Sequence, residues 1–593
     1  MTVSEYIFDF LQKKGCDTVY MVSGSSAMWL TDALQRNEAL NAVCCHHEQA
    51  AAMAADCYGR TRGVPGVCLA TIGPGATNAI TGVAGAFVDS SPMFVLTGQA
   101  NSRLIRYEMD TGIRQHGTQS LNLEPIVSPM VKYFACVMNP ADIRRVMERA
   151  WYEAMDGRRG PVWIDVPVDV QNRQLPEELE GYRAPGRDAG TVDPAAIAWG
   201  LARAEKPLIL AGGGVRSAGA SKLLNRLCET LQIPVATSRG GIDVIASSSP
   251  YFVGRPGSYG DRPSHFAIQQ CDYLLILGSR LSISTTGYYP QRFGQNAYKV
   301  MVDIDQKELD KPDVPVDQKL SMDVKAFLEG LLRCCGGVEP ADHAPWLAHC
   351  REMRRQYPNV LPGYGQERPL NSYYFTQMLS RLAPANCDVV VDTGSVCNVA
   401  SQSWELKAGQ RYLISGGLSA MGFWAGAMGA VQEGRQVLAL SGDGSVQMNV
   451  QEFATLHYNR LPVKLFVFQN SGYLLIRHNQ HNYMDDRFLG VGPDSGLETP
   501  DFCKVAAAYE LDSCELAVGD DLEEKLREIL AKDGPFVCQV RVQEFGELAP
   551  RIASRVMPDG SLKAAEFDDL YPFCTNEGSA DDVPPFRNDS ASG

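Results

Sequence analysis

Apolar, β-rich runs alternate along the chain with segments whose apolar residues recur at helical spacing. In the first part of the chain this pattern predicts strands at residues 18–22, 41–44, 66–72, 91–99 and 160–167. It predicts helices at residues 2–14 and at residues 50–58, the second of which is built mostly from small residues. Strands that alternate with helices in this way are typical of an α/β protein with parallel sheets.

The same alternation returns twice. Strands predicted at residues 207–211, 234–237, 273–277 and 299–303 mark a second unit, Rossmann-like in pattern but without a clean Gly-x-Gly-x-x-Gly motif. At roughly 150 residues per domain, a chain of 593 residues has room for three or four domains. We therefore predict three Rossmann-like parallel-sheet domains and a tail with a disordered end, at residues 1–175, 190–335, 369–550 and 551–593.

One stretch of the third unit indicates a specific chemistry. Gly442-Asp443-Gly444 ends one apolar run, Asn470-Ser-Gly472 follows the next, and the segment between them has helical spacing. In such a βαβ unit both strands end at the same edge, so Asp443 and Asn470 are expected side by side where ligands bind. A carboxylate, an amide oxygen and the Gly472 carbonyl oxygen would suit Mg²⁺ together with a phosphate group. The glycines also let a diphosphate approach the backbone, whereas a lone Gly-Asp-Gly would more simply cap a helix.

Net charge, apolar stretches and cysteine content limit which partners and which cell compartment we expect for this protein. A net charge of −15 argues against nucleic acid and anionic membranes as partners. No basic segment precedes an apolar run at the start and no apolar stretch reaches about 18 residues, so we expect neither a secretory signal nor a membrane span. The 17 cysteines include no Cys-x-x-Cys repeat, and we interpret them as reduced thiols of a cytoplasmic protein.

Further stretches accompany the Gly-Asp-Gly motif, at residues 48–52, 70–78, 89–99, 160–167 and 415–422. With them, the chain resembles the acetolactate-synthase-like group of thiamine diphosphate enzymes over nearly its whole length. The resemblance implies a pyrimidine-binding, a middle and a diphosphate-binding domain, with thiamine diphosphate and Mg²⁺ as cofactors. It also implies a homodimer or homotetramer whose active sites lie between chains. Gln469 departs from the first Asn of the family pattern, while Asn470 keeps the ligand position.

The resemblance assigns roles to particular residues. Glu48 matches the glutamate that hydrogen-bonds a pyrimidine nitrogen and promotes loss of the thiazolium C2 proton, and Gln119 matches a glutamine near the reacting carbon. His116 is a candidate for moving protons. The implied metal ligands are Asp443, Asn470 and Gly472. The implied cofactor contacts are Gly24, Gly73, Asn78, Ser395, Gly417, Leu418, Ser419, Met421, Gly442, Asp443, Gly444, Ser445, Asn470, Gly472 and Tyr473.

Three of these residues also have a simpler interpretation. Without the resemblance, Glu48 would be an acid favoured at a helix N-terminus, Met421 a core residue and His116 an exposed loop residue. In the middle domain the resemblance makes FAD a candidate ligand, although many relatives keep such loops without a nucleotide. The candidate nucleotide contacts are Gly213, Gly214, Arg280, Asp303 and Asp305.

The chain departs from acetolactate synthases just after the metal-binding Asn. Those enzymes have a Met-Val-x-x-Trp-like sequence there, whereas this chain has the polar side chains Arg477, His478 and His481. We expect Arg477 and His478 to help select a polar acceptor, the alternative being a solvated loop. The predicted function is decarboxylation of a 2-oxo acid, with pyruvate the expected donor, and transfer of the two-carbon unit to a carbonyl acceptor. The alternatives are a thiamine-dependent C–C hydrolase, a simple 2-oxo acid decarboxylase and, more remotely, a non-catalytic regulatory relative.

Overall fold

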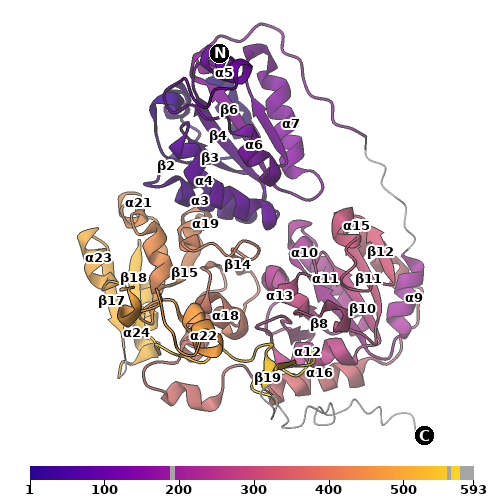
Figure 1. Ribbon diagram of the computed structural model, residues 1–593. Helices are drawn as coiled ribbons and strands as arrows, with labels where there is room; N and C mark the ends of the chain where they lie inside the picture. Colours follow the sequence, from indigo (N-terminus) through magenta and orange to yellow (C-terminus); the bar gives the residue numbers. More distant parts are fainter. Residues whose placement is uncertain (187–193, 518, 557–561, 574–593) are drawn as a thin grey trace, which may run out of the picture. The chain divides into compact units, whose positions relative to one another are not determined.

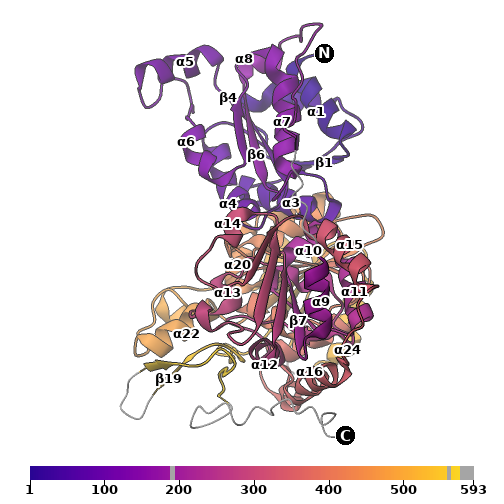
Figure 2. The ribbon, with the colours of Figure 1, turned by 90° about the vertical axis from the view of Figure 1, so that its right-hand side faces the viewer.

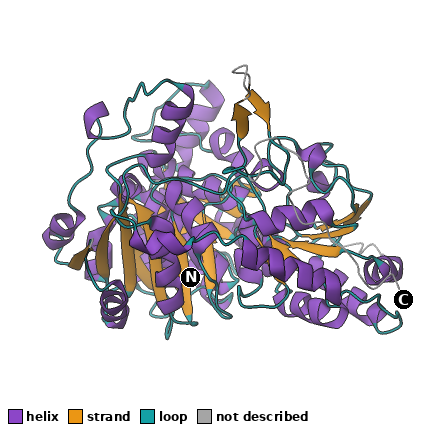
Figure 3. Cartoon of the chain, turned by 90° about the horizontal axis from the view of Figure 1, so that it is seen from below, coloured by secondary structure: helices purple, strands orange, loops and turns teal. Residues whose placement is uncertain are grey.

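The computed structural model describes residues 1–186, 194–517, 519–556 and 562–573. Its strands form three parallel six-stranded sheets covered by helices (Figure 3), so the predicted α/β class with parallel sheets is confirmed. Among the described residues, no helix combines the length and apolar character needed to cross a bilayer. The chain divides into two compact units. The first contains Met1–Arg187, Asn386–Cys397 and Arg411–Phe545, and the second contains Asp188–Ala385, Asn398–Gln410 and Gly546–Gly593.

The first sheet lies in the first unit and has the strand order β2-β1-β3-β4-β6-β5. Figure 1 labels β2, β3, β4 and β6 of this sheet. Its strands are β1 (Thr18–Met21), β2 (Asn41–Cys44), β3 (Gly66–Ala70), β4 (Met93–Gln99), β5 (Tyr133–Cys136) and β6 (Pro161–Pro167). Its helices are α1 (Val3–Lys13), α2 (Met28–Gln35), α3 (Glu48–Arg62), α4 (Pro74–Val88), α5 (Ser102–Thr111), α6 (Glu124–Val127), α7 (Ile143–Met155) and α8 (Val168–Gln171).

Both faces of this sheet are buried, which explains why its central strands are apolar at successive positions. Neighbouring residues of a strand point to opposite faces. Leu69 and Phe94 therefore pack with α1, α2 and α7, whereas Cys68 and Val95 pack with the small-residue helix α3 and with α4. Figure 2 shows α1 and α7 on one side of β4 and β6, with α6 on the other.

The third sheet belongs to the same unit and repeats the connectivity of the first, in the order β14-β13-β15-β16-β18-β17. Its strands are β13 (Cys387–Val391), β14 (Arg411–Ile414), β15 (Gln436–Gly442), β16 (Val463–Gln469), β17 (Asp512–Leu516) and β18 (Phe536–Arg541). The helices of this part are α19 (Ala427–Ala430), α20 (Asp443–Val446), α21 (Glu452–Tyr458), α22 (Leu474–Tyr483), α23 (Phe502–Ala508) and α24 (Leu522–Ala531). Helix α18 (Ser395–Ser403) begins in this unit, and its residues from Asn398 on belong to the second.

One hydrophobic core joins the two halves of the first unit. Helix α3 packs against α19 and the turn before it, and buried Trp424 and Phe453 belong to the same cluster as the alanines of α3. The Tyr20 hydroxyl donates to the carbonyl oxygen of Met428 at 3.4 Å. The small residues of α3 allow this close packing because they leave room for the facing backbone.

The second unit contains a sheet in the order β12-β11-β10-β7-β8-β9. Its strands are β7 (Pro207–Ala211), β8 (Val235–Thr237), β9 (Phe252–Gly254), β10 (Tyr273–Leu277), β11 (Tyr298–Asp303) and β12 (Gln318–Ser321). The helices of this unit are α9 (Ala195–Arg203), α10 (Gly213–Ser217), α11 (Ser221–Leu231), α12 (Arg262–Gln270), α13 (Ile283–Thr286), α14 (Gln306–Leu309), α15 (Val324–Cys335), α16 (Ala344–Gln356) and α17 (Ser372–Leu382). Numbered within this domain, the strand order is the Rossmann order 3-2-1-4-5-6.

The described part of the predicted tail packs on the second unit. β19 (Ser554–Val556) pairs antiparallel with β20 (Leu562–Ala564). Phe567 is buried and stacks on His265 with ring centroids 4.1 Å apart, and the Arg262 guanidinium donates to the Leu570 carbonyl oxygen. The predicted disorder concerns the end of the tail, which lies outside the described residues.

Candidate active site

The candidate site begins where the third sheet reverses its strand order. β13 and β15 are neighbours there, and parallel sheets bind ligands at the carboxyl ends of such strands. Ser395 opens α18 after β13, while Gly442 ends β15 and Asp443 opens α20. The next strand, β16, ends one residue before Asn470. The backbone N–H groups of Asn470 and Gly472 donate to Asp443 Oδ2, each at 3.1 Å, so these three residues lie together as the sequence predicted.

Three oxygens converge at this point. The Asn470 side-chain oxygen lies 3.3 Å from Asp443 Oδ1 and 2.8 Å from the Gly472 carbonyl oxygen, and a rotated amide would donate to both. Asp443 is fully buried, and burial raises the pKa of its carboxyl to about 6 despite hydrogen bonds from Gly444, Gly472, Thr499 and Asn470. With the amide oxygen of Asn470 turned toward Asp443 and Gly472, three acceptors meet, and a hard cation would stabilise that orientation. These residues therefore fit Mg²⁺. The described residues include no cluster of three His, Cys, Asp or Glu side chains for a metal, but this set uses amide and carbonyl oxygens instead.

The neighbouring predicted cofactor contacts surround this edge. The Tyr473 ring packs on Gly444, where a Cβ would come within 2.2 Å of the ring. The Ser445 hydroxyl accepts from the Gly422 N–H at 2.9 Å, which joins α20 to the segment at residues 415–422. In that segment Ser419 has a φ of 54°, Leu418 is 41% exposed and Met421 is half-buried.

The segment at residues 415–422 is held from the first domain of the same unit. Asp89 accepts the N–H groups of Gly416 and Gly417, both at 2.8 Å, and is paired with Arg60. The Gln49 amide donates to the Met421 carbonyl oxygen at 3.2 Å. The loop that carries Met421 is thus fixed by side chains that lie far from it in sequence.

Glu48 is the first residue of α3 and is only 7% exposed. Asn78, from α4, donates to its Oε2 at 2.9 Å. The fully buried carboxylate of Glu452 accepts the N–H groups of His46 and His47, at 3.0 and 2.9 Å, just before Glu48. The position of the Glu48 carboxylate is therefore set from both halves of the first unit.

Gln119 lies beside the predicted cofactor contact Gly73. Gly73 has a φ of 62°, and a Cβ there would come within 2.7 Å of the Gln119 carbonyl oxygen, so this position requires glycine. Gln119 is itself exposed at a φ of 61°. Gly24 follows β1, and a Cβ at this position would come within 2.4 Å of the Thr71 side chain.

His116 is exposed in the same loop. Its backbone N–H donates to Glu108 Oε1 at 2.5 Å, and its ring lies against Tyr107 with centroids 4.7 Å apart. The structure thus holds His116 through its backbone and through a ring contact. These contacts involve α5 and leave its predicted part in proton transfer untested.

The polar stretch after Tyr473 forms helix α22. Arg477 donates to the carbonyl oxygens of Glu544, Ser471 and Val491 at 2.6, 2.9 and 3.0 Å. The His478 ring contacts Phe545 with centroids 4.4 Å apart. The guanidinium of Arg477 therefore ties together three segments beside the oxygen cluster.

The candidate nucleotide residues also come together, in the second unit. Gly213 and Gly214 follow β7, Arg280 follows β10 and Asp303 ends β11, and these three strands are neighbours. The Gly214 N–H donates to the Gly278 carbonyl oxygen, and the Asp305 N–H to Asp303 Oδ1, each at 3.0 Å. The loops thus occupy the edge where Rossmann-type sheets bind ligands, and they also hold one another in place.

Sequence reasoning missed several residues of the site. Thr499 donates to Asp443 Oδ2 at 3.2 Å, and buried Asp392 accepts the N–H groups of Phe423 and Trp424. A polar residue at the end of an apolar run is a signal that could have found Asp392. Nothing in the sequence marks Thr499, which lies in a loop far from Asp443 along the chain.

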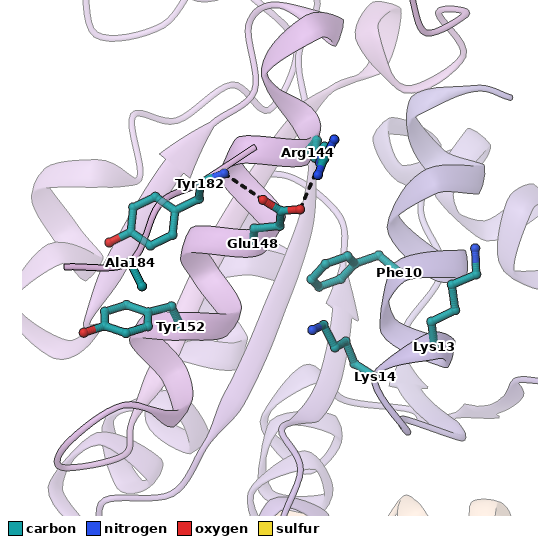
Figure 4. A pocket seen from close by; sticks show the side chains of 8 residues that line it. All are labelled: Phe10, Lys13, Lys14, Arg144, Glu148, Tyr152, Tyr182 and Ala184. Carbon is teal, nitrogen blue, oxygen red and sulfur yellow. Dashed lines mark hydrogen bonds and ion pairs between the residues drawn. The ribbon is translucent and has the colours of Figure 1, made fainter. Parts of the chain in front are cut away.

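A separate pocket of about 620 Å³ lies in the first domain (Figure 4). It is lined by residues of α1 and α7 and by Tyr182, and none of the predicted site residues lines it. Its charged groups are largely paired, since Arg144 bonds Glu148 and Lys13 bonds Asp9. The chemistry described above therefore lies elsewhere.

Comparison with known proteins agrees with this geometry. Residues 1–125 match the thiamine pyrophosphate enzyme N-terminal TPP binding domain, residues 195–331 the central domain and residues 392–540 the C-terminal TPP binding domain. The chain is 30% identical over 561 residues to the acetolactate synthase isozyme 2 large subunit of Escherichia coli, covering 93% of this chain and 97% of that protein. It is also 30% identical over 597 residues to the probable acetolactate synthase large subunit of Methanocaldococcus jannaschii, covering 96% and 98%. The chain belongs to the family of thiamine pyrophosphate-dependent enzymes that includes the acetolactate synthase large subunits.

Proposed function

We propose that this enzyme uses thiamine pyrophosphate and Mg²⁺ to decarboxylate a 2-oxo acid, with pyruvate the expected donor, and joins the two-carbon unit to a carbonyl acceptor. This would make it a lyase and transferase in one. The meeting of Asp443, Asn470 and Gly472 at the carboxyl ends of the neighbouring strands β15 and β16 carries the proposal. The names of the relatives, acetolactate synthases from bacteria, archaea and plants, support the reaction type.

Each part of the site has a proposed task. The bound cofactor supplies an electron sink for the carbanion left by decarboxylation. Asp443, Asn470 and Gly472 hold the metal that neutralises the diphosphate, and Met421 supports the cofactor from the loop anchored by Asp89. Glu48 hydrogen-bonds the pyrimidine from a site largely closed to water, with Asn78 fixing its second oxygen.

Acceptor selection is proposed for the start of α22 and the loop of Gln119. Polar side chains that a bound acceptor buries discriminate strongly, because an acceptor that lacks matching groups leaves them unpaired. His478 and Gln119 would contact the acceptor, with His116 as a candidate for proton transfer. Because Arg477 donates to three carbonyl oxygens, we propose that it acts on selection mainly by fixing the loop after Asn470.

The test is incubation of the purified protein with thiamine pyrophosphate, Mg²⁺ and pyruvate, with aldehyde, keto-sugar and cyclitol acceptors offered in turn. Mass spectrometry of the products separates carboligation from simple decarboxylation. Glu48→Gln should slow exchange of the cofactor C2 proton for deuterium while cofactor binding is kept, and Glu124→Gln is the matched control at an exposed position. An unchanged exchange rate in Glu48→Gln would refute the role of Glu48.

The assembly of the active site is testable by mixing variants. We propose a homodimer or homotetramer in which Glu48 of one chain serves the cofactor held by Asp443 of another. Glu48→Gln and Asp443→Ala would each be inactive alone, yet after subunit exchange the mixture would regain activity because some sites receive both intact residues. A mixture as inactive as its components would mean that each chain builds its own site.

Three further proposals concern the rest of the chain. FAD is the proposed ligand of the second domain, supported by the meeting of its glycine and aspartate loops, and absorbance of flavin in the purified or reconstituted protein tests it.

A cytoplasmic location is supported by the free thiols of the described cysteines. The domain limits predicted from the sequence remain our proposal for limited proteolysis to test.

A further inference from the structure

Two cysteines of the third sheet face each other across neighbouring strands. Cys514, in β17, is the direct register partner of Cys538, in β18, and the strands run parallel. Paired residues in a sheet point to the same face, and strands about 4.8 Å apart lie within the Cα separations of about 4.4–6.8 Å that disulfides span. Both residues are free thiols.

The two thiols differ in access and in acidity. Cys514 is partly exposed on the edge strand of the sheet, whereas Cys538 is fully buried. The hydrogen bond from Cys538 and the positive charge of Lys525 lower the pKa of Cys514, while burial raises the pKa of Cys538 well above its usual value. By contrast, burial raises the pKa of Cys68 to about 12. A reachable thiol of lowered pKa beside a buried thiol is the arrangement of an oxidisable pair.

We propose that Cys514 and Cys538 form a site of reversible oxidation by hydroperoxides, independent of the cofactor chemistry. The Cys514 thiolate attacks hydrogen peroxide, the O–O bond breaks, hydroxide leaves and the sulfur becomes a sulfenic acid. The Cys538 sulfur then attacks the Cys514 sulfur, the S–S bond forms, and the departing hydroxyl leaves as water with the Cys538 proton. The two sulfurs lose two electrons, which reduce the peroxide to water and hydroxide.

A third thiol, Cys503, is the main alternative disulfide partner for Cys514. Cys503 lies in α23, which packs against β17 and β18, but burial raises the pKa of its thiol. It is not a register partner of Cys514. The pairing of Cys514 with Cys538 rather than with Cys503 is therefore the specific content of the proposal.

The experiment treats the full-length protein, loaded with thiamine pyrophosphate and Mg²⁺, with hydrogen peroxide and maps the peptides without reduction. The expected product is a 514–538 disulfide that dithiothreitol reverses. Cys538→Ser should stop at a sulfenic acid on residue 514 that dimedone traps, Cys514→Ser should form neither product, and Cys503→Ser should behave like the unmodified protein. Exposed Cys44 is the reference thiol, and Cys514 should react several-fold faster with peroxide.

Three results would overturn the proposal. They are a 503–514 disulfide, direct oxidation to sulfinic acid without any disulfide, and a Cys514 reaction no faster than that of Cys44. Binding of thiamine pyrophosphate by Cys514→Ser, measured by calorimetry, verifies that the variant is folded, since neither cysteine belongs to the cofactor site. The readout is the disulfide itself, so it does not depend on the proposed carboligation.

Discussion

Replacing Glu452 tests how the two halves of the first unit hold Glu48. The Glu452 carboxylate is fully buried, and its Oε1 accepts both the His46 and the His47 N–H. Its Oε2 accepts the Thr455 hydroxyl at 2.6 Å. Glu452→Ala removes both acceptor oxygens and leaves these three donors without them. A buried donor without a partner costs about 1–3 kcal/mol, and the two backbone donors are only partly buried, so we expect a local destabilisation of about 2–4 kcal/mol.

The conservative variant separates hydrogen bonding from charge. In Glu452→Gln the amide oxygen can remain where Oε1 lies, so both backbone bonds survive, and the Thr455 hydroxyl can turn to accept from the amide nitrogen. We therefore expect Glu452→Gln to cost little. Burial raises the pKa of the Glu452 carboxyl, which shows that burying the charged form is costly. Glu452→Gln removes that cost, and this gain offsets the weaker hydrogen bonds that a neutral acceptor makes.

Hydrogen exchange of the peptide that spans residues 45–52 is the direct assay. A local loss of about 2–4 kcal/mol corresponds to exchange faster by about 30- to 900-fold in Glu452→Ala. A peptide from β7, in the second unit, should be unchanged. Exchange of the cofactor C2 proton should slow in Glu452→Ala and be retained in Glu452→Gln. Unchanged protection in Glu452→Ala, or equal losses in both variants, would refute the reasoning.

The other predictions concern the metal, a buried acid and the loop after Asn470. Asp443→Ala should weaken cofactor binding by several kcal/mol in calorimetry with Mg²⁺, and a chelator should abolish the difference from the unmodified protein. Burial raises the pKa of Asp165 to about 7, against about 3.9 when unfolded, so stability should fall as pH rises from about 4 to about 7 and then level off. Asp165→Asn should flatten this dependence in urea denaturation, and an equal slope would exclude Asp165 as its source. Arg477→Ala should raise the Mg²⁺ concentration needed for cofactor binding; an effect on acceptor KM alone would instead make Arg477 a substrate contact.

The sequence pattern predicted the central strands of the first two sheets because those strands are buried on both faces. β3, β4, β7 and β10 are apolar at almost every position, and the predicted ranges contain them. The pattern missed edge strands such as β5, β12 and β17, all of which are partly exposed; β12 and β17 also mix polar with apolar residues. A short strand at an edge resembles a loop in sequence, because only the pairing with its neighbour defines it.

The candidate site shows the same limit. The meeting of Asp443 and Asn470 was predictable, because the ends of adjacent parallel strands must share an edge. The contacts of Arg477 were not, because its partners are carbonyl oxygens and every residue carries one. An arginine that follows a metal-binding loop therefore has the same sequence signature whether it binds a substrate or fixes the backbone. Only the positions of the acceptors distinguish the two.

Three carboxylates of the first unit fix the backbone of segments that lie near the candidate site. Asp392, Asp89 and Glu452 each accept two successive backbone N–H groups of a segment remote in sequence. Their donors are Phe423 and Trp424, Gly416 and Gly417, and His46 and His47, respectively. Hydrogen bonds to a charged acceptor are stronger than neutral ones, and two of them fix both the position and the direction of a turn. Each pair of hydrogen bonds acts on a segment that carries, directly precedes or directly follows a predicted site residue, namely Gly417, Glu48 and Met421. The geometry of the site is therefore set before the cofactor binds, by acids that were not among the predicted site residues.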